Sequence, residues 1–148
     1  MAHRFDHGHI KSRDPRRTAQ WWADTFGAKL VPEFSSGEVL FAPIEIGGVK
    51  INISRPSPAE AAETEEGSAA IHFGLEHLGL ETDDLDADLE RLRAQGLVVF
   101  EVRETPSMRI AFVETPDAVR VELMQRKAQL LVPHRRAGQP KGGRDEGR

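Results

Sequence analysis

The chain contains short stretches in which every second residue is hydrophobic, and two stretches in which hydrophobic residues recur every three or four positions. Alternation puts one face of a strand against the core, whereas the longer period puts one stripe of a helix there. The expected strands are residues 5–12, 29–34, 39–46, 49–54, 97–103, 109–114 and 119–125, with a further short strand around residue 77. The pattern therefore predicts a mixed protein of two helices and several strands.

Both helices are bounded by residues that favour helix ends. Asp14 precedes Pro15 and can cap the first helix, which is expected to end at Gly27. Asp84 and Gly96 take the same places around the second helix. The apolar stripes expected to face the core are Ala19, Trp22, Ala23 and Phe26 in the first helix, and Leu85, Leu89 and Leu92 in the second.

The two halves of the chain repeat each other at a fixed offset. His7 and His77 lie 70 positions apart, and the aspartates before the helices and the last strands keep the same offset. An offset held over separate elements indicates two copies of one unit, a strand, a helix and three strands. We therefore expect one domain over residues 1–125, built from repeats at 4–55 and 74–125.

Length and composition limit the class of protein. A chain of 148 residues suits one domain, and its basic tail, residues 126–148, is expected to be disordered. The net charge of −4 gives no basic field for nucleic acid, and the absence of cysteine excludes disulfides and thiolate metal sites. No apolar run is long enough to cross a membrane, and the polar N-terminus lacks the apolar core of a secretory signal. A cytoplasmic protein with no nucleic-acid or membrane partner is expected.

The strands bring a set of polar side chains to one face. Their apolar sides, which carry Ile10 and Ile51 in the first repeat, must pack on the helices. The opposite sides carry His7, His9, Lys50 and Asn52 in the first repeat and His77, Arg120 and Glu122 in the second. If the repeats pack about a pseudo-twofold axis, His7 meets His77 and Asn52 meets Glu122.

Two imidazoles and one carboxylate on a concave sheet form a ligand set for a divalent metal. We therefore expect His7, His77 and Glu122 to bind Zn, Ni, Co, Mn or Fe, among which these ligands do not discriminate. The alternative is that each histidine is a half-exposed strand residue with no ligand. The other histidines fall outside the repeat and are expected not to take part; they are His3, His72 and His134.

The chain resembles the vicinal oxygen chelate superfamily in the segments DHGHIKSRDPRRTAQWWADTFGAKLV, EHLGLETDDLDADLERLRAQG and TPDAVRVELM. This superfamily includes glyoxalase I, methylmalonyl-CoA epimerase, extradiol dioxygenases, fosfomycin-resistance transferases and bleomycin-binding proteins. The resemblance implies an α+β fold in which two βαβββ modules form a cup-shaped, mostly antiparallel sheet, usually in a homodimer. It also places the family's metal positions at His7, Asn52, His77 and Glu122.

Three functions follow from the resemblance. The first is a metal-dependent isomerase or lyase of the glyoxalase and epimerase kind, acting on a small carbonyl or thioester substrate through a metal-stabilised enolate. The second is an Fe(II) extradiol-type dioxygenase, although such enzymes usually use a catalytic tyrosine and this chain has none. The third is a non-catalytic drug-binding protein of the bleomycin-resistance type, although such proteins generally lack the metal residues. Thiol transfer to fosfomycin remains a further alternative, but the family's threonine two residues beyond the first ligand is His9 here.

The base for proton transfer is expected to be His9, because glyoxalase I has a glutamate where this chain has Asn52. His9 lies on the same strand face as His7, and its counterpart in the second repeat is Gly79, so it breaks the repeat as a residue with a one-sided task would. Glu122 acting as both ligand and base is one alternative. A His9 that only supports the wall of the site is another.

Three further residues are expected to bind the substrate. Lys50 and Arg120 are related by the repeat and would clamp a carboxylate or phosphate; alternatively, they are strand-end cations that extend into water. Asn52 would supply a neutral oxygen ligand or a hydrogen bond to a metal-bound water.

Overall fold

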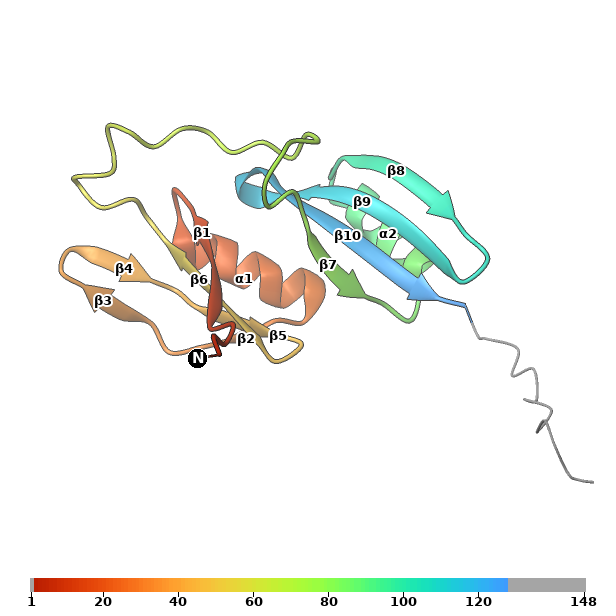
Figure 1. Ribbon diagram of the computed structural model, residues 1–148, viewed down its shortest axis with the longest axis horizontal. Helices are drawn as coiled ribbons and strands as arrows, with labels where there is room; N and C mark the ends of the chain where they lie inside the picture. The colour runs from red at the N-terminus through yellow and green to blue at the C-terminus, as the bar shows by residue number, and fades with distance from the viewer. Residues whose placement is uncertain (1, 128–148) are drawn as a thin grey trace, which may run out of the picture.

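The structure, a computed structural model, describes residues 2–127, which form two modules side by side (Figure 1). The first module contains β1 (His7–Lys11), α1 (Pro15–Phe26), β2 (Lys29–Leu30), β3 (Phe34–Ser36), β4 (Val39–Phe41), β5 (Ile44–Ile46) and β6 (Val49–Ser54). The second contains β7 (Leu78–Glu81), α2 (Leu85–Ala94), β8 (Val99–Glu104), β9 (Met108–Thr115), a 3₁₀ turn (Pro116–Ala118) and β10 (Val119–Arg126). Residues 128–148, which include most of the tail expected to be disordered, lie outside the described residues.

Each module has its own sheet, and most neighbouring strands are antiparallel. The first sheet has the order β2-β5-β6-β4-β3, with β1 paired in parallel with β6. The second has the order β7-β10-β9-β8, with β7 parallel to β10. Within residues 2–127 no backbone hydrogen bond joins one module to the other. The predicted α+β class with two helices and open, mostly antiparallel sheets is confirmed.

Two of the predicted strands are interrupted. The stretch expected at residues 29–34 is divided at Pro32, which lies between β2 and β3, and the one expected at 39–46 is divided at Pro43, between β4 and β5. Proline has no backbone N–H and cannot donate to the ladder, so a continuous strand was the wrong prediction in both places. The hairpin expected at Gly47 and Gly48 is present, with φ angles of 57° and 79° that suit glycine.

Both N-caps and the end of α1 are as predicted, whereas the C-cap of α2 is Gln95, one residue before the expected Gly96. Asp14 Oδ1 accepts a hydrogen bond from the Arg17 backbone N–H at 3.2 Å, and Gly27 ends α1 with a φ of 69°.

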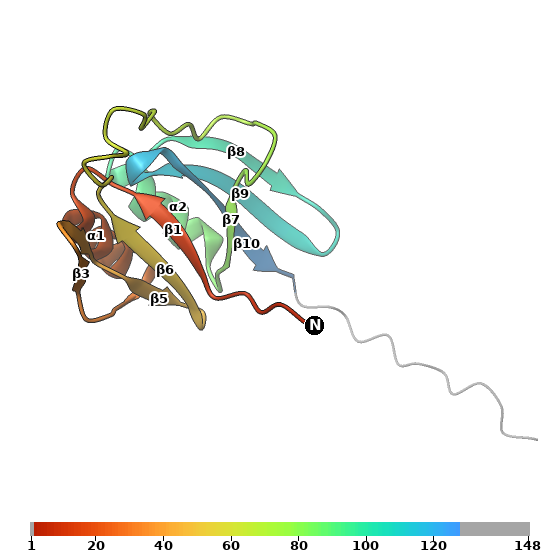
Figure 2. The same cartoon turned by 60° about the vertical axis from the view of Figure 1, so that its left-hand side comes forward.

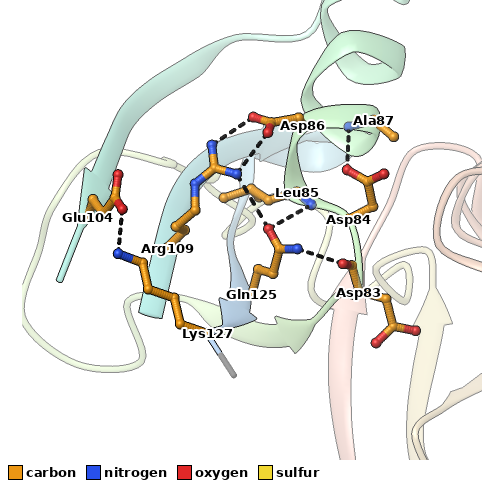
Figure 3. A network of polar contacts seen from close by, with 9 residues as sticks. All are labelled: Asp83, Asp84, Leu85, Asp86, Ala87, Glu104, Arg109, Gln125 and Lys127. Carbon is orange, nitrogen blue, oxygen red and sulfur yellow. Dashed lines mark hydrogen bonds and ion pairs between the residues drawn. The ribbon is translucent and has the colours of Figure 1, made fainter. Parts of the chain in front are cut away.

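Figure 3 shows how the start of α2 is fixed to β9 and β10. There Gln125 accepts a hydrogen bond from Leu85 N at 3.3 Å, and Arg109 makes a two-pronged ion pair with Asp86 at 2.7 and 2.8 Å.

Both modules contribute to one hydrophobic core. In Figures 1 and 2 the helices lie on the same side of the two sheets, and side chains from α1, α2, β6 and β10 pack together there. Its largest fully buried members are Trp22, Ile44, Ile53, Leu85, Leu92, Leu123, Val113 and Val121. The polar side of each sheet is thereby turned away from the helices, as the strand pattern predicts.

Two polar contacts also join the modules. Thr18 in α1 donates to Asp117 Oδ2 at 2.5 Å, and the Arg91 guanidinium in α2 donates to the Thr25 carbonyl in α1. Asp117 has a φ of 62°, a left-handed conformation that aspartate tolerates better than most residues.

No helix within residues 2–127 is long and apolar enough to cross a membrane.

The segment between the modules, residues 55–77, crosses above the sheets in the view of Figure 1. Its first part is fixed by a capping box: the Ser57 backbone N–H donates to Glu60 Oε2 at 2.8 Å, and Glu60 N donates to Ser57 Oγ at 3.3 Å. Lys11 in β1 donates to the same carboxylate at 3.0 Å. These hydrogen bonds lower the pKa of Glu60 to about 2, so the acidic linker is ionised where it meets β1.

Candidate functional site

A cavity of about 890 Å³ lies between β1, the linker, β7 and the turn before β10. Its walls include three predicted site residues, namely His9, His77 and Arg120. The other predicted residues, His7, Lys50, Asn52 and Glu122, do not line it. A cavity of this volume is of the size that small-molecule sites usually have.

His77, which lines this cavity, contacts Glu122, which does not. The His77 Nε2 atom is 3.3 Å from Glu122 Oε2, and the side chains are 34% and 16% exposed. Glu122 pairs in register with Gly79, where an added Cβ would lie 3.6 Å from its Oε2. That distance is an ordinary contact, and the closer neighbour of such a Cβ would be Met124 Cε at 3.3 Å. Phe112 contacts the other side of His77 edge-on, with ring centres 5.3 Å apart.

The structure does not bring His7 to this pair. His7 Nδ1 lies 2.6 Å from Asp6 Oδ2, and its ring centre is 6.2 Å from that of His9, close to the spacing of alternate residues on a strand. Among residues 2–127 no group of three or more His, Asp or Glu side chains is close enough to hold a metal ion. The structure therefore supplies two of the three predicted ligands as a pair and places the third elsewhere on the first sheet.

His9 makes a hydrogen bond that determines its tautomer. Its Nε2 is 2.8 Å from Ser54 Oγ, and the Ser54 hydroxyl donates its one proton to the Arg55 carbonyl at 3.1 Å. When the hydroxyl donates to that carbonyl, it accepts from His9 Nε2–H, and Nδ1 of the neutral ring carries the lone pair. Burial, with the nearby charges of Lys11 and His7, lowers the pKa of His9 below its usual value. His9 is thus uncharged at neutral pH and can accept a proton at Nδ1.

Arg120 is held inside the second module. It is 6% exposed, and its guanidinium lies over the rings of Phe100 and Phe112 at 4.9 and 4.5 Å from their centres. Its Nη1 donates to the Ala69 carbonyl at 3.0 Å, and its Nε is 2.9 Å from Glu76 Oε1. The Nε contact is an ion pair without an aligned hydrogen bond. Most of the guanidinium is therefore engaged within the chain.

Lys50 and Asn52 lie on β6, the strand paired beside β1 in the first sheet. Lys50 pairs in register with His7, and its Nζ is 3.9 Å from Asp6 Oδ2, an exposed contact. Asn52 pairs with His9 and is 7% exposed, and its Oδ1 has no hydrogen-bond partner among the described residues. A buried acceptor without a partner is costly, so this oxygen is suited to a donor that the chain itself does not supply.

Two functional contacts were missed by the sequence analysis. Glu76 Oε2 accepts a hydrogen bond from His77 Nδ1, and Ser54 orients His9. A signal for the first was present, because an acid stands directly before each repeated histidine, Asp6 before His7 and Glu76 before His77. Ser54 lies two positions after Asn52 and therefore falls on the same polar face by alternation, but nothing in the sequence distinguishes it from other small polar residues.

Comparisons with known proteins agree with this architecture. The family described as Glyoxalase/Bleomycin resistance protein/Dioxygenase superfamily matches residues 4–123. A comparison with curated protein sequences gives no match.

Three similar solved structures illustrate the range of relatives. TnmS3, an antibiotic binding protein from Streptomyces sp. CB03234, is 21% identical, with a TM-score of 0.61 over 86% of this chain and 98% of that one. A glyoxylase/bleomycin resistance protein/dioxygenase domain from Frankia sp. EAN1pec is 20% identical, with a TM-score of 0.66 over 86% and 100%. A mutant of the fosfomycin resistance protein FosX from Listeria monocytogenes, complexed with Mn(II) and 1S,2S-dihydroxypropylphosphonic acid, is 16% identical, with a TM-score of 0.66 over 86% and 95%. At these sequence identities, the similarity to the three solved structures shows a shared fold alone.

Proposed function

Since the chain belongs to the Glyoxalase/Bleomycin resistance protein/Dioxygenase superfamily, we propose that it is a metal-dependent lyase or isomerase that moves a proton next to the carbonyl of a small ketone or thioester substrate. The observation that carries this proposal is the His77–Glu122 pair, 3.3 Å apart, whose histidine lines the same cavity as His9. The pair offers a cation site and His9 offers a base, which are the two groups that such a reaction needs.

The chemistry of the pair supports a bound cation. A neutral imidazole with Nδ1–H presents a lone pair at Nε2, and an ionised Glu122 presents lone pairs opposite it. Two acceptors 3.3 Å apart repel each other unless a cation lies between them, either a proton that makes His77 an imidazolium or a metal ion. Imidazole and carboxylate suit Zn, Ni, Co, Mn and Fe alike, and His7 remains the proposed third ligand. When bound, such an ion supplies Lewis acidity toward the substrate carbonyl.

His9 is the proposed base. Its Nδ1 lone pair is left free by the hydrogen bond to Ser54, its lowered pKa keeps it neutral at pH 7, and it lines the cavity. Asn52 does not line the cavity but pairs in register with His9, and its unpartnered Oδ1 is proposed to receive a hydroxyl or amide donor of a substrate that extends past His9. Of the two proposed substrate cations, Arg120 would act at the cavity wall, whereas the more exposed Lys50 lies outside the cavity and would meet only a part of the substrate that extends beyond it.

The reaction is tested by deuterium incorporation. Metal-loaded protein is incubated in D₂O with candidate 2-oxo and acyl-thioester substrates, and deuterium at the α position is followed by NMR. We expect exchange that falls about 100-fold or more in His9→Ala while metal content is unchanged. His72→Ala is the matched control, because His72 also lines the cavity but its ring nitrogens contact the Ala70 and Leu75 carbonyls. Equal rates in wild type and His9→Ala would exclude His9 as the base.

A non-catalytic small-molecule binding protein is the second candidate. The observation that favours it is the separation of His7 from the His77–Glu122 pair, which leaves the predicted ligand set divided. Tight binding of a drug-like ligand in the cavity, without deuterium exchange by the metal-loaded protein, would support this alternative. Oxygen consumption with catechols by the Fe(II) form, without exchange, would support a dioxygenase instead.

A homodimer is proposed, and apolar side chains on the surface of the described chain support it. Ile71, Phe73 and Leu75 in the linker are 81%, 105% and 82% exposed, and Phe5 near β1 is 78% exposed. Surface patches of this kind usually mark contacts with other molecules. Sedimentation at micromolar concentration is expected to give twice the chain mass of 16.5 kDa, and Phe73→Asp is expected to shift the protein toward monomer. A wild-type protein that sediments as a monomer contradicts the dimer.

A further inference from the structure

The two modules carry the same arrangement of an acid, a histidine and a cation. In each, the acid stands directly before the histidine, and the cation lies on the parallel strand beside it, 70 positions from its counterpart in the other module. The members are Asp6, His7 and Lys50 in the first module, and Glu76, His77 and Arg120 in the second. We refer to these two sets as the first and second acid–histidine–cation units.

Corresponding groups meet in both units, through one carboxylate oxygen in the first and through both oxygens in the second. In the first, Asp6 Oδ2 lies 2.6 Å from His7 Nδ1 and 3.9 Å from Lys50 Nζ. In the second, Glu76 Oε2 contacts His77 Nδ1, and Glu76 Oε1 lies 2.9 Å from Arg120 Nε. In both units the carboxylate therefore joins the Nδ1 side of the imidazole to the cation. Because the same contact occurs in two modules of different sequence, it is not explained by a chance contact of one side chain.

We propose that Glu76 is a positioning residue for His77, and Asp6 for His7, and that each carboxylate, with its cation beside it, holds its imidazole with Nδ1–H directed at the carboxylate. Nε2 then faces away from that carboxylate, and in His77 it faces Glu122 Oε2 at 3.3 Å. The inference rests on the proposed function in one respect, which is that the Nε2 of each histidine is proposed to bind the metal. It also gives Arg120 a task inside the protein, that of orienting Glu76.

The hydrogen-bond chemistry requires this tautomer. Glu76 Oε2 contacts His77 Nδ1, and Asp6 Oδ2 lies 2.6 Å from His7 Nδ1. A carboxylate oxygen accepts hydrogen bonds, so the imidazole nitrogen that faces it donates. A histidine that binds a metal through one nitrogen commonly donates the other to such a carboxylate, which fixes the ring orientation.

The second unit is the more rigid. Arg120 is 6% exposed between two aromatic rings, and the Glu76 side chain is 21% exposed, whereas Lys50 and Asp6 are 44% and 77% exposed. Exposed ion pairs are weakened by solvent and by the freedom of their side chains. We therefore expect a large effect when Glu76 is removed and a small one when Asp6 is removed.

The test uses two measurements on the full chain. Long-range ¹H–¹⁵N NMR of the metal-free protein at about pH 8, where an ordinary imidazole is neutral, reports which ring nitrogen carries the proton. Calorimetric titration with Ni²⁺ reports affinity. In Glu76→Ala we expect His77 to lose its Nδ1–H preference and the Ni²⁺ affinity to fall about 10–100-fold. Asp6→Ala should change His7 in the same direction but by less, and Arg120→Met should loosen Glu76 and shift His77 part of the way.

Glu81 provides a matched control. It is a glutamate of β7 paired with an arginine of β10, Arg126, at 3.0 Å, but it contacts no histidine, so Glu81→Ala should change neither measurement. If Arg120→Met does not fold, Glu76→Ala still tests the proposal, because the Glu76 side chain is not deeply buried and its truncation should leave the fold intact. If Glu76→Ala leaves both the His77 tautomer and the Ni²⁺ affinity as in wild type, the proposal is overturned. A protein that binds no metal, but in which Glu76→Ala changes the His77 tautomer, contradicts the proposed function and supports the positioning pair.

Discussion

The Glu122→Ala variant is expected to keep its fold and to lose its divalent metal, from about one ion per chain in the wild type to nearly none. Glu122 supplies the one anionic ligand of the proposed set, and without it His77 has no charged partner at Nε2 within 3.3 Å. The side chain is partly exposed and lies beside the small Gly79, so its truncation should disturb little packing. His77→Ala is expected to have the same result, because it removes the other half of the pair.

Metal content after mild purification, measured by elemental analysis and compared with circular dichroism, checks this expectation. Glu114→Ala is a suitable control, because Glu114 also lies at a sheet position beside β10, opposite Arg120 in the register, without contacting a histidine. His7→Ala separates the two versions of the site: loss of metal supports the three-residue set, and full retention removes His7 from it. Wild-type metal content in both His77→Ala and Glu122→Ala would exclude the site.

The Trp22→Ala variant is expected to lose about 3–5 kcal/mol of unfolding free energy. Trp22 is fully buried at the centre of the core that both modules share, with the ring of Phe26 5.4 Å away. Truncation removes the largest buried side chain of the core and leaves a cavity between the helices and sheets. Because a domain of this size is stable by only about 5–15 kcal/mol, such a loss would leave a marginal fold.

Urea unfolding of three variants tests the packing explanation. The Trp22 Nε1–H has no hydrogen-bond partner among the described residues, so Trp22→Phe removes no hydrogen bond and should cost less than half as much as Trp22→Ala. Trp21→Ala is the neighbouring control, because Trp21 is only partly buried at the edge of the same core, and about 1 kcal/mol is expected. Equal losses in Trp21→Ala and Trp22→Ala would contradict the assignment of Trp22 to the core.

The features that depend on neighbouring residues could be predicted from the sequence. The caps at Asp14 and Asp84, the glycine hairpin before β6 and the offset of 70 positions all follow from local conformational preference and repetition. The superfamily and the α+β fold are likewise confirmed. The divided strands were missed because alternation was followed through Pro32 and Pro43, whose missing N–H should have ended each strand.

The arrangement of the two modules could not be predicted in the same way. The expectation that His7 meets His77 rested on pseudo-twofold symmetry, whereas the observed arrangement depends on side chains such as Trp22 and Leu89 packing across the modules. No periodicity encodes those contacts, because they join residues far apart in the chain. The pairing of His77 with Glu122 was easier to foresee, since β7 and β10 belong to one module and their register follows from the repeat.

The separation of the ladders into two sheets also bears on motion. Because no backbone hydrogen bond within residues 2–127 crosses between the modules, the angle between the sheets is set by packed side chains, by the Thr18–Asp117 contact and by the linker. A shear of one module against the other can therefore leave every strand pair intact, and motions of this kind take place on the microsecond to millisecond scale. The cavity has walls in both modules, so a shear of this kind would change its width.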